Sequence, residues 1–141
     1  MDRRVRRGAA LVLGVYAAVV VVVLLSPISP EVAVAWLTAL LRDDVGWSAV
    51  RQGWVEFALN IALFVPLGLL VTMLFRRVWL GVVTALLLSV AAEAVQEFLP
   101  GRLASLRDVL ANVVGAAIGA FIAWIILRRL RGRAASPSDK P

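Results

Sequence analysis

The chain has 141 residues, enough for one domain, and 62% of them are hydrophobic. Soluble domains contain roughly 45–50% apolar residues, so a soluble fold of this size could not bury so much apolar surface. The absence of cysteine and histidine excludes disulfides, thiol nucleophiles, imidazole bases and the usual zinc ligands. The net charge of +6 comes from arginines that cluster at the ends of apolar runs, which indicates membrane orientation and not nucleic-acid binding. We therefore expect an all-α membrane protein with no cofactor and no metal site.

Four apolar stretches are each long enough to cross the hydrocarbon core of a bilayer, which takes about 20 helical residues. They are residues 8–25, 57–75, 78–99 and 109–127. A signal peptide is an alternative interpretation of the first stretch, but the residues after it lack the small side chains of a cleavage site. The pattern predicts a polytopic bundle of four transmembrane helices in one domain, residues 1–130. Residues 131–141 are small, polar and proline-bearing, which predicts a disordered cytoplasmic tail.

The connection between the first two stretches contains a shorter helix signal. Ser29 is a favourable N-cap, Pro30 suits the first helical position, and Glu31 suits the first turn. The apolar residues that follow are too few to span a bilayer. We therefore expect a short helix that lies in the interface or re-enters the membrane.

Lys and Arg residues are divided unequally between the two ends of the predicted helices. One end carries eleven of them, in the amino-terminal segment, at Arg76 and Arg77, and in the carboxyl-terminal segment. The other end carries four. Because cytoplasmic loops are enriched in Lys and Arg, both termini are expected in the cytoplasm, with residues 26–56 and 100–108 outside.

Polar side chains gather near the outer ends of three predicted helices. Glu93, Gln96 and Glu97 share one face of the third helix. Glu93 precedes Leu99 by six residues, which places it roughly 9 Å below the outer end. A carboxylate at that depth costs at least ~2.5 kcal/mol in contact with lipid, so it should face protein or water.

The second and fourth helices carry polar groups at a matching depth, and two arginines of the outer loop should lie over them. These arginines could neutralise a carboxylate or bind a phosphate or carboxylate from outside. We therefore predict an outward-facing polar pocket. Its predicted ligand-binding residues are Glu56, Asn60, Glu93, Gln96, Glu97, Arg102, Arg107, Asp108 and Asn112.

Other residues have predicted structural roles. Ser105 can cap the fourth helix, with Asp108 completing a capping box. Prolines and glycines should end the third helix, break a backbone hydrogen bond in the second, and allow close helix contact. These residues are Pro66, Gly68, Pro100, Gly101, Gly115 and Gly119.

Three sequence blocks occur in order: NIALFVPLG at 60–68, EAVQEFLPGR at 93–102 and RDVLANVVGAAIG at 107–119. Together they resemble the VanZ-like family of small bacterial membrane proteins, first known from glycopeptide (teicoplanin) resistance clusters. The motif positions are Asn60, Pro66, Gly68, Glu93, Gln96, Arg102, Asp108, Asn112 and Gly115. Family members often carry a second aromatic or acidic residue between PGR and the aspartate, where this chain has LASLR. The resemblance implies a bacterial plasma-membrane protein linked to antibiotic resistance.

Three functions remain open at this point. The first is binding of a membrane-lipid headgroup, a lipid-linked envelope precursor or a lipophilic glycopeptide. The second is an intramembrane enzyme that uses Glu93, Glu97 or Asp108 as catalytic groups, with Arg102 and Arg107 holding an anion. The third is a structural role, in which the polar groups fix helix packing. The sequence leaves open the ligand or substrate, whether the protein is catalytic, the drug spectrum, metal use and the oligomeric state.

Overall fold

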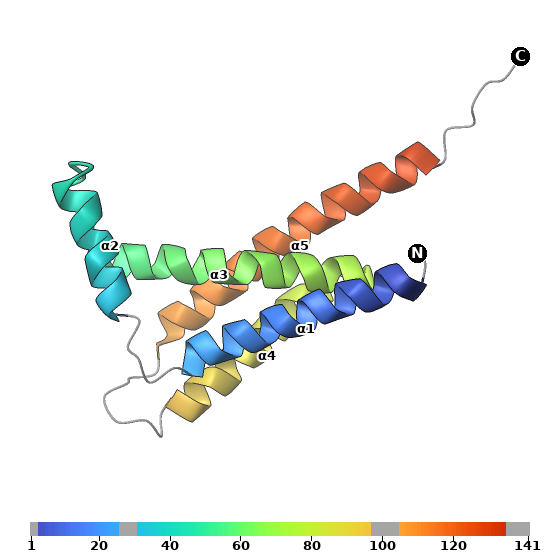
Figure 1. Cartoon of the computed structure of the whole chain (residues 1–141), viewed down its shortest axis with the longest axis horizontal. Coiled ribbons are helices and arrows are strands. Elements are labelled where there is room, and N and C mark those ends of the chain that lie inside the picture. Colours follow the sequence, from blue (N-terminus) through green and yellow to red (C-terminus); the bar gives the residue numbers. More distant parts are fainter. Residues whose placement is uncertain (1–2, 26–30, 97–104, 135–141) are drawn as a thin grey trace, which may run out of the picture.

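The computed structural model describes residues 3–25, 31–96 and 105–134. The described residues form five helices and no strand. These are α1 (Arg3–Leu25), α2 (Glu31–Asp43), α3 (Gln52–Phe75), α4 (Val78–Gln96) and α5 (Leu106–Ala134). In Figure 1, α1, α3, α4 and α5 run lengthwise, and α2 lies across one end. The all-helical prediction is confirmed for the part of the chain that the structure describes.

The helices extend beyond several of the predicted boundaries. α3 begins at Gln52, five residues before the predicted stretch, and α5 continues to Ala134. Residues 131–134 are therefore helical, although the disordered tail was predicted to start there, and residues 135–141 lie outside the described part. α2 confirms the short helix predicted in the first long connection, and its predicted capping residues Ser29 and Pro30 also lie outside the described residues.

Three of the described helices are long and apolar enough to cross a membrane, over Gln52–Phe75, Val78–Val95 and Leu106–Arg131. The continuous apolar part of α1 is shorter, Ala10–Val23. Large aliphatic side chains cover the outside of the bundle; Leu11 is 69% exposed and Leu87 is 65% exposed. Soluble proteins rarely leave extended apolar surfaces uncovered, so the surface matches lipid tails and not water.

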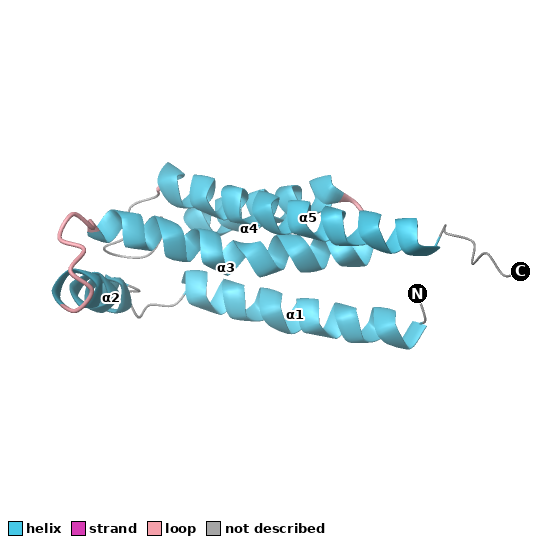
Figure 2. Cartoon of the chain, turned by 90° about the horizontal axis from the view of Figure 1, so that it is seen from above, coloured by secondary structure: helices cyan, strands magenta, loops and turns pink. Residues whose placement is uncertain are grey.

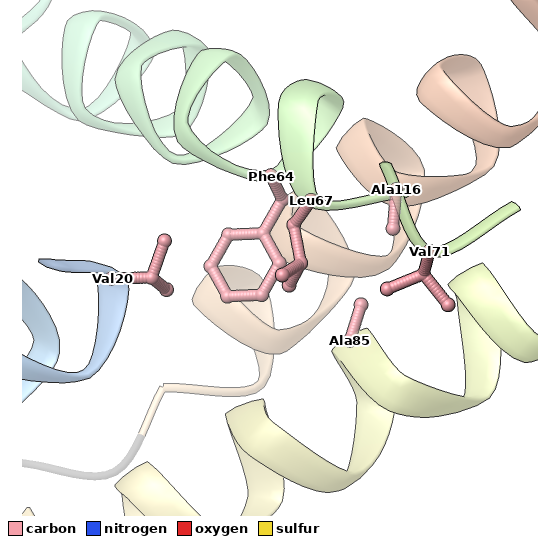
Figure 3. Packing of buried hydrophobic residues seen from close by; sticks show 6 residues of the cluster. All are labelled: Val20, Phe64, Leu67, Val71, Ala85 and Ala116. Atoms are coloured by element: carbon pink, nitrogen blue, oxygen red, sulfur yellow. The ribbon is translucent and has the colours of Figure 1, made fainter. Parts of the chain in front are cut away.

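α3 is the central helix, and it packs against each of the other four. Its buried side chains Phe64, Leu67 and Val71 form the middle of the core (Figure 3). Three further helices contribute one buried side chain each to this core: Val20 from α1, Ala85 from α4 and Ala116 from α5. Figure 2 shows that α1 lies along one side of this bundle, while α4 and α5 lie on the other side of α3.

α3 and α5 approach each other so closely that their backbones touch. A Cβ atom at Gly119 would lie 2.8 Å from the backbone nitrogen of Leu69, and one at Gly68 would lie 2.6 Å from the Cα of Ala116. A Cβ at Gly115 would collide with the carbonyl oxygen of Ile61. These contacts are consistent with the packing roles predicted for the three glycines, because a Cβ at each position would collide with backbone atoms of the neighbouring helix.

Pro66 lies inside α3, where its missing N–H leaves the carbonyl of Ala62 without its usual helical donor. The hydroxyl of Tyr16 on α1 donates to the next carbonyl, that of Leu63, at 2.6 Å. This hydrogen bond attaches α1 to α3 beside the proline. The sequence did not indicate this role for Tyr16, because nothing local marks which helix faces the proline.

Candidate functional site

The polar residues predicted to form a site lie at the end of the bundle that α2 crosses. α3 and α5 begin at this end and α4 finishes there (Figure 1). Four of the predicted residues lie outside the described part of the chain, namely Glu97, Pro100, Gly101 and Arg102, as does the side chain of Gln96. The remaining residues form a group that we call the acceptor cluster: Glu56, Asn60, Glu93, Asp108 and Asn112.

Two hydrogen bonds join three helices in the acceptor cluster. The amide Nδ2 of Asn60 on α3 donates to Oδ1 of Asp108 on α5 at 3.1 Å. The backbone N–H of Ser105, just before α5, donates to Oε2 of Glu93 on α4 at 2.8 Å. Both interactions are half-buried, and Glu56 lies half-buried one turn before Asn60. The prediction that polar groups of three helices converge at one end is consistent with these contacts.

The start of α5 departs from the predicted capping box. Ser105 acts as the N-cap, since its Oγ accepts the backbone N–H of Asp108 at 3.4 Å. In a capping box, Asp108 would in turn accept the N–H of Ser105. That part of the prediction is wrong, because Glu93 from α4 accepts this N–H instead. The Asp108 carboxylate is thereby available to Asn60.

Arg107 lies at the edge of the cluster and is directed toward the first turns of α3. Its guanidinium donates to the carbonyl of Gly53 and lies 5.6 Å from the centre of the Phe57 ring. In the part of the chain that the structure describes, it forms no ion pair with Glu93 or Asp108. Arg107 therefore joins α5 to α3 through a backbone carbonyl and a cation–π contact, and its side chain is exposed.

Asn112 lies one turn after Asp108 on α5 and is only 3% exposed. Its Oδ1 atom is buried without a hydrogen-bond partner among the described residues. A buried acceptor left unpaired costs about 1–3 kcal/mol, so such atoms usually have a reason to persist. Asn112 is consequently the member of the cluster whose bonding is incomplete.

The acceptor cluster is rich in oxygen atoms that accept hydrogen bonds. Three carboxylates and two amides suit a ligand that carries hydroxyl, amine or amide donors. Among the described side chains, no three acidic groups are arranged so that they could hold a metal ion. The chemistry of this end is therefore hydrogen-bond acceptance, with Arg107 as its nearby cation.

A family model described as VanZ/LLP1 matches residues 12–128. This chain belongs to the VanZ/LLP1 family. The match extends from α1 to the last turns of α5, so it includes the acceptor cluster and confirms the resemblance carried by the three sequence blocks. No curated protein and no solved structure matches the chain.

This VanZ/LLP1 chain has a second polar region at the opposite end of the bundle. A cleft of about 260 Å³ lies there, and it is lined by Thr72, Arg76, Val78, Trp124, Leu127, Arg128 and Arg131. The sequence predicted a topological role for the arginines first, with binding of anionic lipid headgroups as a secondary use, and no role for Thr72. The packing face of α4 could have been identified from the sequence. Small residues recur every four positions along this helix, and Gly81, Ala85 and Ser89 are all buried.

Proposed function

We propose that this VanZ/LLP1 family member binds the polar head of an amphiphile at the acceptor cluster and so contributes to glycopeptide resistance. The ligand classes that fit are a membrane-lipid headgroup, a lipid-linked envelope precursor and a lipophilic glycopeptide such as teicoplanin. Each combines an apolar anchor with several hydrogen-bond donors. An apolar anchor suits the lipid-facing surface of the bundle, and the donors suit the carboxylate and amide oxygens of the cluster.

The proposal includes α1 as a fourth membrane span. α1 has 23 residues, and at about 1.5 Å per residue such a helix can cross a hydrocarbon core of about 30 Å. We place the protein in the bacterial plasma membrane with both termini in the cytoplasm, because the arginine-rich end would then obey the positive-inside rule. The acceptor cluster would face outward, toward the leaflet where envelope precursors and glycopeptides meet.

The observation that carries the proposal is the unpaired Oδ1 of Asn112. The carboxylates of Glu93 and Asp108 already accept hydrogen bonds from neighbouring segments, so each has a partner within the protein. Asn112 lies one turn deeper with an acceptor that no described residue uses. A donor from a bound ligand would supply the missing hydrogen bond and would recover most of the desolvation cost.

The test is Asn112→Ala, measured for both stability and function. The substitution removes an unsatisfied acceptor, which is stabilising, and also removes packing, which is destabilising. The free energy of unfolding in detergent should therefore change by no more than about 1 kcal/mol. Teicoplanin susceptibility of a sensitive host should return to the level of cells without the protein, and the purified variant should retain less labelled lipid-linked precursor or teicoplanin. Ser89→Ala is the matched control, since it also removes a buried, unpaired oxygen but lies outside the cluster.

Full resistance and full ligand retention in Asn112→Ala, at unchanged expression, would contradict the proposal. Equal functional loss in Ser89→Ala would also contradict it, because the loss would then follow from any change in the buried helix contacts. Wild-type protein that leaves drug susceptibility unchanged and retains none of the three ligand classes would refute binding altogether.

A structural role for the cluster is the second candidate. The observation in its favour is that the carboxylates of Glu93 and Asp108 each accept a hydrogen bond from another segment of the protein. Glu93→Gln separates the two functions, because glutamine keeps an oxygen for the Ser105 N–H while losing the charge. A structural role predicts unchanged stability and unchanged resistance, whereas a charge that contacts ligand or takes part in chemistry predicts loss of resistance at normal stability.

A further inference from the structure

The arginine-rich end of the bundle contains a cleft whose walls come from three helices. Thr72 lies near the end of α3 and Arg76 follows it, Val78 begins α4, and the other lining residues belong to the last turns of α5. These segments are distant in sequence, so the cleft exists only in the folded bundle. Its volume of about 260 Å³ is large enough for a small polar group but not for a large ligand.

The charge of the cleft is uniformly positive. Three arginines line it, Arg76, Arg128 and Arg131, and no acidic residue of the described chain joins them. The guanidinium of Arg128 lies 5.3 Å from the centre of the Trp124 ring, which limits its freedom before any ligand arrives. Guanidinium groups bind phosphate oxygens through paired, charge-assisted hydrogen bonds, so the chemistry of this cleft suits an anion.

The backbone of Arg76 supports a role for its side chain. Arg76 caps α3 with φ 57° and ψ 28°, in the left-handed region, and its N–H donates to the carbonyl of Thr72 at 2.7 Å. Glycine or asparagine usually occupies this position, because a Cβ is unfavourable there. An arginine that keeps this conformation at the wall of a basic cleft is a backbone outlier of the kind found at functional sites.

The position and the apolar walls of the cleft favour a lipid over a free anion. The apolar segments of α3 and α5 end at Phe75 and Arg131, and the apolar segment of α4 begins at Val78. The cleft therefore lies at the level where a bilayer changes from acyl chains to headgroups. Val78 and Trp124 are 39% and 41% exposed and belong to the apolar surface of the bundle. Thr72, which also borders the cleft, is fully buried, and its Oγ1 lacks a hydrogen-bond partner among the described residues.

We propose that this cleft is a binding site for the phosphate group of an anionic phospholipid. The arginines hold the phosphate, Trp124 and Val78 contact the glycerol and upper acyl chain, and the positive charge selects against zwitterionic lipids. The site is separate from the acceptor cluster, which lies at the other end of the bundle, and it does not depend on the function proposed there.

The test compares a cleft variant with a variant of equal charge. The cleft variant carries Arg76→Gly, Arg128→Gln and Arg131→Gln. The control carries Arg7→Gln, Arg77→Gln and Arg129→Gln, which are exposed arginines that do not line the cleft. Purified full-length proteins in zwitterionic nanodiscs are titrated with phosphatidylglycerol, with phosphatidylcholine and with inorganic phosphate, and retained lipid is measured by native mass spectrometry.

The wild-type protein should retain phosphatidylglycerol at least tenfold more strongly than phosphatidylcholine. Each arginine near an anionic lipid contributes about fivefold in affinity, so the cleft variant should lose roughly 100-fold. The control should lose less than about tenfold, through the weaker long-range charge effect. Equal losses in the two variants would overturn the proposal, as would equal retention of the two lipids. Displacement of phosphatidylglycerol by an equal concentration of inorganic phosphate would overturn the lipid assignment.

Arg76→Gly alone keeps the test valid if the triple variant fails to fold. Glycine relieves the left-handed backbone and retains the N–H that bonds to Thr72, so the midpoint of thermal unfolding should rise or stay equal. Retention of phosphatidylglycerol should nevertheless fall about fivefold. Unchanged retention in a well-folded Arg76→Gly protein would overturn the role of this arginine and with it the proposed site.

Discussion

Gly119→Ala should separate α3 from α5 and destabilise the bundle. The new Cβ would lie 2.8 Å from the nitrogen of Leu69 and 2.9 Å from the carbonyl carbon of Val65, whose oxygen would be closer still. Ordinary contacts of this kind begin at 3.4 Å, and the obstructing atoms belong to a helix backbone that cannot rotate away. Overpacking costs about 1–3 kcal/mol and more against a rigid neighbour, whereas the gain in helix propensity from glycine to alanine is only about 1 kcal/mol. We expect a net loss of about 2 kcal/mol.

The measurement is unfolding in mixed micelles, followed by far-ultraviolet circular dichroism during an SDS titration. Gly14→Ala on α1 is the matched control, since a Cβ there meets nothing within 4 Å. The control should be as stable as the wild type or more stable by up to about 1 kcal/mol. A Gly119→Ala protein as stable as the Gly14→Ala protein would refute the close α3–α5 contact.

Two further predictions concern hydrogen bonds between helices. A double-mutant cycle of Asn60→Ala and Asp108→Ala should show a coupling free energy of about 1 kcal/mol in SDS unfolding, because the Asn60 amide donates to the Asp108 carboxylate; additive losses would exclude the bond. Tyr16→Phe should lower the unfolding free energy by about 1 kcal/mol, because the carbonyl of Leu63 loses its donor from α1, and a variant of unchanged stability would show that α1 is held by apolar packing alone.

Much of the fold follows from sequence periodicity. The glycine pair Gly115 and Gly119 lies one turn apart on a single face, and a face without side chains can only serve close helix contact. The sequence also predicted Asn60 and Asp108 at the same end of the bundle, although their hydrogen bond to each other was not predicted. Such features can be predicted because helical geometry places residues four apart on the same face of a helix.

Other features depend on three-dimensional placement that a single sequence does not contain. The sequence predicted Asp108 as the acceptor of the Ser105 N–H, but the approach of α4 to the start of α5 gives that role to Glu93. The left-handed backbone of Arg76 was not predicted, because a left-handed residue at the end of a helix is usually recognised in a sequence as a glycine. The cleft beside it was missed because its walls come from segments that are about 50 residues apart in the chain.

The α3–α5 contact connects the chemistry of both ends of the molecule. α3 carries Asn60 near one end and Thr72 near the other, while α5 carries Asp108 near one end and Arg128 near the other. Because backbone touches backbone between these helices, we expect a shift at Gly119 to move the members of both sites. Gly119→Ala should therefore weaken resistance and phosphatidylglycerol retention together, whereas Asn112→Ala and Arg76→Gly should each affect only its own end. If the two single-end variants instead changed both readouts, the acceptor cluster and the basic cleft would have to be one coupled site and not two.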